Sequence, residues 1–306
     1  MIIVVCLNPA LDVTHHVDAV DWGGVNRPRA VRARPGGKGL NVARTLHALG
    51  VDVLVLGLAG GITGAGVQAA LRERCVPAAF TPVAGETRRT FSVVDDSRVT
   101  AFYEAGPAVS GEEFAAFRRG YEQALDGAAA VVLSGSLPPG LADSTYATLI
   151  EIAVAASVPA VLDTHGEALR LGAAAGAAIV KPNLAELESL TGHKLAAPDE
   201  VIAAAGRLRG AQAAVVTLGP DGLLAATGDG CWRARAPATV TGNATGAGDA
   251  VAAALAHGLV LGRPWDERLR HAAALGAATA AAPVAGEFRR QDYLGALTAV
   301  AVEEVR

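Results

Sequence analysis

Short runs of uninterrupted apolar residues recur along this chain of 306 residues, and helical segments lie between them. The runs lack the polar alternation of a strand with one solvated face, which indicates strands buried on both faces, as in a parallel sheet. The predicted strands are Ile2–Cys6, Val53–Gly57, Ala130–Leu133, Ala160–Leu162, Ala178–Val180 and Ala214–Leu218. This alternation predicts a doubly wound α/β fold that binds its ligands at the C-terminal ends of the strands.

The intervening helices are predicted from their ends and their apolar spacing. Ser110 and Glu113 have the spacing of a capping box ahead of a helix over Phe114–Leu125. The other predicted helices are Leu40–Leu49, Thr145–Ala156 with Asp143 as its cap, Ala250–Leu261 and Glu267–Ala281. We expect all of them to belong to one α/β domain over residues 1–306.

Two stretches, about 12–34 and 87–104, break this rhythm with alternating Thr, Val and Arg residues and turn signals. Such a pattern is typical of strands with one solvated face. We expect these stretches to leave the main layer and to pair with each other as a small sheet. That sheet would act as a lid over the ligand site and not as a separate folding domain.

Composition excludes several classes of protein. A net charge of −4 and a pI near 6.0 argue against a general nucleic-acid or membrane-surface binder. Three dispersed cysteines make a disulfide framework or a zinc site improbable and fit the reducing cytoplasm. The apolar start has no cationic leader and is interrupted by Asn8-Pro9, so it predicts a first strand and no signal peptide.

A glycine-rich turn at residues 243–249, Asn-Ala-Thr-Gly-Ala-Gly-Asp, directly precedes an apolar helix. Gly246 and Gly248 let backbone amides approach a ligand, and the helix N-terminus adds positive charge, so the turn is a candidate anion hole. Asp249 stands beside it, where a carboxylate can accept a hydroxyl proton during phosphoryl transfer. A capped helix without chemistry explains the same residues, because a lone glycine-rich turn is a weak signal.

A second glycine-rich turn, at residues 35–41, also leads into a helix. It is not a Walker A loop, since the required Ser or Thr is missing. Gly36 and Gly37 allow backbone amides to meet sugar hydroxyls, and Lys38 and Asn41 supply side-chain donors. The alternative is a helix start with a solvated lysine.

Two polar runs follow predicted strands. In the run that starts at Lys181, Asn183 and Glu186 are spaced to orient water around Mg²⁺, and the same spacing fits a capping box, so the two interpretations are compatible. The run Ser-Gly-Ser-Leu-Pro-Pro-Gly at residues 134–140 lacks the spacing of a hydrolase nucleophile elbow. Its Ser136 is a candidate substrate contact.

Taken together, these segments resemble the PfkB/ribokinase family of sugar kinases. The runs that carry the resemblance are NPALD (8–12), GGKGLNVA (36–43), SGSLPPG (134–140), KPNLAEL (181–187), VTLGPDG (216–222) and TGAGD (245–249), in the family's order and spacing. Within the family the chain resembles the hexose-phosphate branch. The resemblance implies a three-layer α/β/α ribokinase-like fold with a β-sheet lid, ATP and Mg²⁺ as cofactors, and a homodimer formed through the lid.

The resemblance also implies the roles of individual residues. Asp249 matches the catalytic base, and its anion hole is formed by Gly246, Ala247 and Gly248. The expected substrate contacts are Asp12, Gly36, Gly37, Lys38, Asn41 and Ser136. The expected ATP contacts are Lys181, Asn183, Thr217, Gly219 and Gly222, and the expected Mg²⁺ site is Glu186 with Asn183, through water.

Arg88 and Arg27 are candidates for binding a phosphate that the substrate already carries. The hexose-phosphate branch has an Arg at the position of Arg88, and a guanidinium suits phosphate because it presents a planar fork of donors. Arg27, on the other lid segment, is expected to join it. The alternative is that Arg88 and Arg89 are solvated strand residues that point to opposite faces.

The expected reaction is ATP-dependent phosphorylation of fructose 1-phosphate to fructose 1,6-bisphosphate. The alternatives are kinases of tagatose 6-phosphate or fructose 6-phosphate, a kinase of an unphosphorylated sugar or nucleoside, and a sugar-phosphate-binding regulator without turnover. The chain departs from the family pattern at His165, Thr90 and Ala244, and the first two leave the choice of sugar open.

Overall fold

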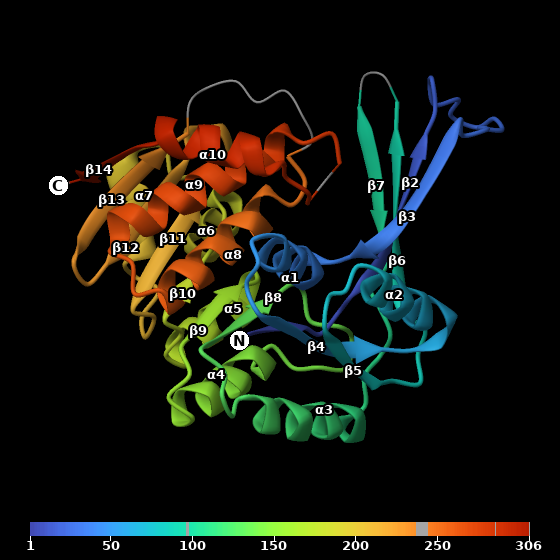
Figure 1. Ribbon diagram of the computed structural model, residues 1–306, viewed down its shortest axis with the longest axis horizontal. Coiled ribbons are helices and arrows are strands. Elements are labelled where there is room, and N and C mark those ends of the chain that lie inside the picture. Colours follow the sequence, from blue (N-terminus) through green and yellow to red (C-terminus); the bar gives the residue numbers. More distant parts are fainter. Residues whose placement is uncertain (96–97, 237–243, 285, 306) are drawn as a thin grey trace.

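A ten-stranded sheet forms the centre of the computed structural model, which describes residues 1–95, 98–236, 244–284 and 286–305 (Figure 1). Its strands, in spatial order, are β14 (Ala301–Val305), β13 (Gly230–Arg235), β12 (Leu223–Thr227), β11 (Ala213–Thr217), β10 (Ile179–Val180), β9 (Ala160–Asp163), β8 (Ala130–Ser134), β1 (Ile2–Cys6), β4 (Val53–Ala59) and β5 (Ala78–Pro82). Neighbours from β11 to β5 are parallel, whereas β12, β13 and β14 are antiparallel. All six predicted strands lie in the parallel part.

Helices cover both faces of this sheet and complete three α/β/α layers (Figure 1). Alternate residues of β1 enter opposite cores, with Val4 on one side and Val5 on the other. The helices of the first core are α1 (Lys38–Ala48), α2 (Gly61–Glu73), α8 (Ala247–Val260), α9 (Trp265–Ala281) and α10 (Arg290–Ala299). Those of the second core are α3 (Gly111–Ala124), α4 (Thr145–Ala155), α5 (Gly166–Ala174), α6 (Leu184–Thr191) and α7 (Pro198–Ala205). The predicted three-layer architecture is confirmed.

The helix ends confirm one predicted cap and correct another. Ser110 and Glu113 form the expected capping box at the start of α3. The prediction that Asp143 caps α4 is wrong, because Ser144 occupies the N-cap position and makes no side-chain cap. Ser144 already has helical backbone angles, and the Thr145 amide donates to the Ala142 carbonyl, so a tight backbone turn leads into this helix.

A four-stranded sheet projects from the main body (Figure 1). Its strands, in spatial order, are β3 (Ala30–Gly36), β2 (Ala10–His16), β6 (Arg88–Val94) and β7 (Val99–Tyr103). The parallel pair β2–β6 joins the two stretches that the sequence sets apart, as predicted, apart from residues 96–97, which lie outside the described part. We call these four strands the small sheet. Its inner end lies at Ala10, four residues after β1, and its outer end lies at His16.

Within the described ranges, no helix combines the length and the apolar character needed to cross a membrane.

Candidate active site

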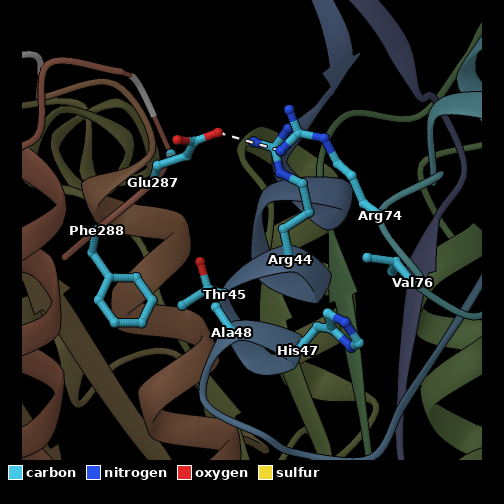
Figure 2. A pocket seen from close by; sticks show the side chains of 9 residues that line it. Arg44, Thr45, His47, Ala48, Arg74, Val76, Glu287 and Phe288 are labelled. Carbon is cyan, nitrogen blue, oxygen red and sulfur yellow. Dashed lines mark hydrogen bonds and ion pairs between the residues drawn. The ribbon is translucent and has the colours of Figure 1, made fainter. Parts of the chain in front are cut away.

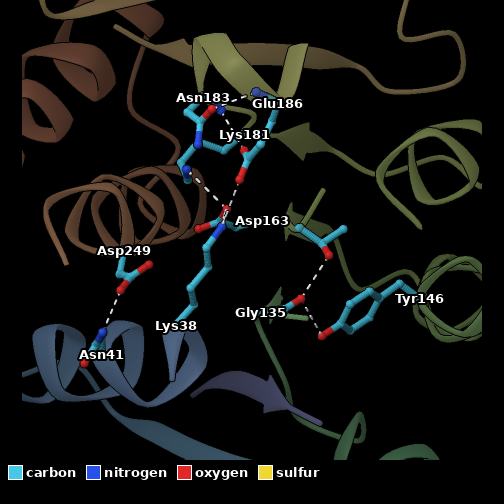
Figure 3. A network of polar contacts seen from close by, with 10 residues as sticks. Lys38, Asn41, Gly135, Tyr146, Asp163, Lys181, Asn183, Glu186 and Asp249 are labelled. Carbon is cyan, nitrogen blue, oxygen red and sulfur yellow. Dashed lines mark hydrogen bonds and ion pairs between the residues drawn. The ribbon is translucent and has the colours of Figure 1, made fainter. Parts of the chain in front are cut away.

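Polar side chains gather at one edge of the main sheet, where the parallel strands β8 to β11 end (Figure 3). Asp163 is the last residue of β9, and Lys181 directly follows β10. The sequence folds this way because parallel strands that share a direction deliver their C-terminal residues to the same edge. Helix α8 points its N-terminus at this group and brings Asp249 to it.

The turn before α8 depends on glycine at one position. Gly246 is the N-cap residue and has a left-handed backbone, with φ of 89°. A Cβ there would lie 2.6 Å from the Gly286 Cα, so neither the conformation nor the space admits a side chain. The predicted anion-hole residues Gly246, Ala247 and Gly248 therefore lie at the positive end of α8. Asn243, which begins the sequence run, lies outside the described residues.

Asp249 is 6% exposed and accepts a hydrogen bond of 2.7 Å from the Asn41 Nδ2 atom. Burial raises the pKa of Asp249 to about 6, and the negative charge of Asp163 acts in the same direction. The Asn41 hydrogen bond and the ammonium groups of Lys38 and Lys181 oppose this rise. A carboxylate with this pKa is mostly ionised at neutral pH and is more basic than an exposed Asp, as a general base requires.

Two lysines share the carboxylate of Asp163 (Figure 3). The Nζ atoms of Lys38 and Lys181 lie 3.1 Å and 3.2 Å from its Oδ1 atom. Burial alone would lower the pKa of Lys38, but the carboxylates of Asp163, Glu186 and Asp249 outweigh it, so the pKa of Lys38 is raised and the side chain stays charged. The site thus holds two fixed positive charges close to the base.

Asp163 is a site residue that the sequence analysis did not select. It is fully buried, and its Oδ2 atom has no hydrogen-bond partner among the described residues. A buried oxygen without a partner is costly unless a ligand or an ion completes it. The available signal was an acidic residue placed directly after a wholly apolar strand.

Asn183 and Glu186 form a capping box at the start of α6. The Asn183 Oδ1 atom accepts from the Glu186 amide at 2.8 Å, and the Glu186 Oε2 atom accepts from the Asn183 amide at 2.8 Å. The remaining Glu186 oxygen lies 3.3 Å from the Lys38 Nζ atom. In the part of the chain that is described, no group of three or more His, Cys, Asp and Glu side chains forms a metal cage.

Asp249 is held by a chain of contacts through α1. The Arg44 Nη2 atom donates to the Asn41 Oδ1 atom at 2.6 Å, and the Arg44 Nη1 atom donates to the Pro35 carbonyl at 2.7 Å. Arg44 therefore fixes the amide orientation of Asn41, which in turn donates to Asp249. The sequence analysis missed Arg44, because an arginine within a helix is ordinarily solvated.

The inner end of the small sheet adds polar groups, among them the predicted substrate contacts Asp12 and Ser136. Asp12 accepts a hydrogen bond from the Thr90 hydroxyl, across the β2–β6 pairing. A Cβ at Gly36 would lie 2.0–2.1 Å from the Asp12 carboxylate, so this glycine provides room for the Asp12 side chain on the neighbouring strand. The Asn8 Nδ2 atom donates to the Ser136 hydroxyl at 3.2 Å, which places Ser136 at the same end. Thr90 was noted as a departure and is now seen to orient Asp12.

Arg88 and Arg89 differ as neighbouring strand residues should. Arg88 is half-buried, and its Nε atom donates to the Asn8 carbonyl at 3.2 Å. Arg89 is exposed, and its guanidinium lies 5.7 Å from the centre of the Phe91 ring. Both arginines lie at the inner end of the small sheet, but Arg88 turns its side chain towards the Asn8 carbonyl and Arg89 turns its side chain to the other face.

Arg27 is not brought to Arg88 within one subunit. It lies on the connection between β2 and β3, beyond the outer end of the small sheet (Figure 1). Its neighbour Arg29 bonds through its amide to the His16 carbonyl, whereas Arg88 pairs with Ala10. At roughly 3.3 Å per residue, the six residues from Ala10 to His16 separate the two ends by about 20 Å. The prediction that both arginines meet is therefore wrong for a single subunit, because the strands carry them to opposite ends.

The predicted nucleotide loop lies beside this group. The Thr217 amide donates to the Pro182 carbonyl at 3.0 Å, so β11 ends next to the run that contains Lys181. A short 3₁₀ helix, η1 (Gly219–Asp221), follows. Gly222 has φ of 90°, and a Cβ there would lie 2.1 Å from the Ala234 carbonyl oxygen, so the turn into β12 requires glycine.

Comparison with known proteins gives one consistent result. Residues 4–289 match the model of the pfkB family carbohydrate kinases. The chain is 34% identical over 282 residues to the 1-phosphofructokinase of Bacillus subtilis, covering 92% of each protein. It is 38% identical over 304 residues to the ATP-dependent 6-phosphofructokinase isozyme 2 of Mycobacterium tuberculosis, covering 95% of this chain and 87% of that protein.

Solved structures agree with this result. A Thermotoga maritima protein whose name is "possible 1-phosphofructokinase" superposes with a TM-score of 0.91 at 26% identity, covering 100% of this chain and 99% of the other. Phosphofructokinase-2 from Escherichia coli, solved with potassium, superposes with a TM-score of 0.90 at 29% identity, covering 97% and 98% of the two chains.

Proposed function

The chain belongs to the pfkB family of carbohydrate kinases, and from that premise we propose that it transfers the γ-phosphoryl group of ATP to fructose 1-phosphate, giving ADP and fructose 1,6-bisphosphate. The observation that carries the proposal is Asp249, which is buried, has a raised pKa and lies at the N-terminus of α8 beside two lysines. The identity with the Bacillus subtilis 1-phosphofructokinase favours this sugar phosphate.

In the proposed reaction, Asp249 accepts the proton of the acceptor hydroxyl as that oxygen bonds to the γ-phosphorus. The bond between the γ-phosphorus and the bridging oxygen breaks, and ADP leaves with the electron pair. The transition state is loose, so alignment and charge stabilisation matter more than base strength. The amides of Gly246, Ala247 and Gly248 at the start of α8 stabilise the charge on the transferring group.

The nucleotide is proposed to lie along the ends of β10 and β11. Lys181 and Lys38 attract the phosphates, and the turns at Gly219 and Gly222 leave room for the rest of the nucleotide. Asn183 and Thr217, which are joined by a β-bridge, hold this side of the site together.

Mg²⁺ is proposed to accompany ATP. The residues present fit a weakly held ion better than a protein cage, because Glu186 and Asn183 spend much of their bonding capacity on the capping box. The Asp163 oxygen without a partner adds an acceptor that suits a hard cation or its water. When bound, the ion would neutralise phosphate charge, and these three residues would orient its water shell.

The sugar phosphate is proposed to bind between the main sheet and the inner end of the small sheet. Its hydroxyls contact Asp12, Asn41 and the amides of Gly36 and Gly37, and Ser136 lies at the same end. Arg88 is the proposed anchor for the phosphate that the substrate already carries, since Arg89 faces away. The small sheet would then act as a lid that excludes water from the transferring group.

A homodimer through the small sheet is also proposed. Its strands expose large apolar side chains, with Val99 at 61%, Phe102 at 58% and Tyr103 at 69% exposure, and exposed apolar strands invite pairing. In a dimer, the outer end of the small sheet would meet the other subunit. The proposed substrate-binding role of Arg27 therefore depends on the dimer. Light scattering at micromolar concentration tests this. A strict monomer would reject the dimer but not the lid.

The cellular location and the binding partners follow from the same proposal. A kinase of a small sugar phosphate works in the cytoplasm, where its ATP is, and its partners are small molecules and not nucleic acid or membrane. The charge balance and the dispersed cysteines support this.

The substrate is tested by one assay of ADP release across fructose 1-phosphate, fructose 6-phosphate, tagatose 6-phosphate, fructose and ribose. We expect the highest kcat/KM with fructose 1-phosphate. The second candidate is fructose 6-phosphate, favoured by the identity with the Mycobacterium tuberculosis isozyme. Preference for fructose or ribose would overturn the hexose-phosphate assignment, and no turnover with any sugar would favour a regulator.

A further inference from the structure

A cavity of about 310 Å³ lies against α1, between the end of α2 and the segment that follows α9 (Figure 2). Its lining includes Arg44, His47, Arg74, Glu287 and Phe288. Apart from Arg44, which also holds the Asn41 amide, these residues differ from those assigned above to the base, the sugar and the nucleotide. A volume of this size is at the lower end of the range for small-molecule sites.

The cavity has a buried cation that lacks full compensation. Arg44 is 7% exposed, and its Nε atom has no hydrogen-bond partner among the described residues. Burial, followed by the charges of Arg34 and Arg74, lowers the pKa of Arg44 to about 10, and Glu287 offsets only part of this. An anion in the cavity would supply the missing countercharge.

At the mouth of the cavity, Glu287 forms a weak ion pair with Arg74. Its Oε1 atom lies 3.3 Å from the Arg74 Nη1 atom, and both side chains are nearly half exposed (Figure 2). An exposed pair of this kind contributes little stability, so a better anion can replace Glu287. Phosphate is such an anion, because its oxygens match the planar fork of a guanidinium.

We propose that this cavity is a second, non-catalytic site for a phosphate group, carried by inorganic phosphate or by a small phosphate ester. Arg44 and Arg74 bind the phosphate oxygens, and Glu287 moves aside. Phe288 and Val76 form an apolar wall that suits the carbon part of an ester. No residue of the catalytic anion hole takes part.

The site has a direct structural connection to the base. The Arg44 guanidinium that faces the cavity also holds the Asn41 amide, and Asn41 donates to Asp249. On the other side, the Gly286 amide donates to the Thr245 carbonyl at 2.8 Å, next to the turn that begins α8. A bound phosphate therefore contacts a residue that positions the catalytic carboxylate.

Phosphate binding is measured by phosphorus NMR titration of the full chain at saturating ADP and constant ionic strength. Arg74→Gln removes one proposed ligand, and Arg72→Gln is the matched control, since it removes an exposed charge from the same helix outside the cavity. We expect Arg74→Gln to raise the Kd for inorganic phosphate by about tenfold and Arg72→Gln to leave it unchanged. Glu287→Gln should lower the Kd by about two- to fivefold.

A phosphate Kd that is equal in Arg74→Gln and Arg72→Gln would overturn the proposal, and so would a Glu287→Gln variant that binds phosphate more weakly than the unsubstituted protein. Phosphoglycolate distinguishes the two ligand sources: tighter binding than inorganic phosphate identifies an ester site, and equal binding identifies a site for the phosphate group alone. The measurement reads binding and not turnover, so it stands apart from the choice of sugar.

Discussion

The edge of the main sheet and the small sheet both carry charged groups towards the substrate, but they are built in opposite ways. At the main-sheet edge, Asp163 and Lys181 are 0% and 3% exposed and are held by ion pairs. In the small sheet, β3 and β7 are mostly exposed, and Arg88 donates to the backbone carbonyls of Asn8 and Glu104. The chemical groups are thus fixed before substrate arrives, whereas the recognition groups remain open to it. Changes at the first region should alter kcat, and changes at the second should alter KM.

The sharpest test of the fixed region is Asp249→Asn. We expect kcat to fall by at least about 10²-fold, the lower range for loss of a general base, while ATP binding and folding persist. Turnover and ATP affinity are measured on the same preparation. A kcat within about threefold of the unsubstituted enzyme would remove Asp249 from its assigned role.

The matching test of the open region is Arg88→Ala, with Arg89→Ala as its control on the opposite face. Loss of a charge-assisted phosphate contact of about 2–3 kcal/mol should raise the sugar-phosphate KM roughly 30–150-fold and leave the ATP KM nearly unchanged. Arg89→Ala should change neither. If both variants keep the fructose 1-phosphate KM within about twofold, the phosphate anchor lies elsewhere.

The pH dependence of kcat/KM tests the ionisation of the buried Asp249 carboxylate. Because the pKa of Asp249 is raised to about 6 and the base acts when ionised, kcat/KM should fall about tenfold per pH unit below that value. Asn41→Ala removes a hydrogen bond that lowers this pKa, so its acidic limb should lie at higher pH. An unchanged limb in Asn41→Ala would show that another group sets the profile.

The same raised pKa predicts an effect on stability. Folding favours the protonated carboxyl, so the stabilisation is fully present below the unfolded pKa and is lost as the pH rises through about 6. Asp249→Asn should therefore be more stable than the unsubstituted protein at pH 8, by an amount on the order of 3 kcal/mol, and the difference should vanish near pH 4. Denaturant unfolding at the two pH values measures it.

The smallest expected effect concerns the metal. Glu186→Gln should raise the Mg²⁺ concentration needed for half-maximal turnover by about tenfold, because it weakens the orientation of the ion's water. Glu188→Gln is the control, since Glu188 lies on the same helix but pairs with Lys194. Identical Mg²⁺ titrations for the two variants would leave Glu186 as a helix cap alone.

The sequence predicts the parallel core well for a physical reason. Strands such as Ile2–Cys6 are wholly apolar because both faces are buried, so the pattern has no competing interpretation. The antiparallel strands β12 and β13 were not predicted. Most of β13 is only partly buried, and β12 (Leu223–Thr227) contains two alanines, which carry little strand signal.

The site is predicted less completely than the fold. Glycine-rich turns identify Asp249 and Asn41 separately, but their hydrogen bond joins residues 208 positions apart, which no local spacing reveals. Asp163 and Arg44 were missed because their roles depend on neighbours that only the tertiary structure supplies. That Arg27 does not meet Arg88 within one subunit could not be foreseen for the same reason, since strand direction decides which end of a sheet a residue reaches.

The path of the chain through the small sheet has a consequence for recombination. Each half of that sheet is one continuous stretch that leaves and re-enters the main layer at nearly the same place, as the pairings Ala10–Gly36 and Thr90–Tyr103 show. Two crossovers per half would therefore exchange the small sheet, which carries the proposed recognition groups, between relatives while every strand of the main sheet stays intact. Within the small sheet, the seam at which donor and recipient halves must match is the parallel β2–β6 pairing. The inserts must also fit α2, which contacts β2 and β3. A chimera that takes both halves from one parent keeps that parent's β2–β6 pairing. If the small sheet sets the sugar preference as proposed, a new preference can then be acquired by exchanging the two stretches together and not by one substitution at a time.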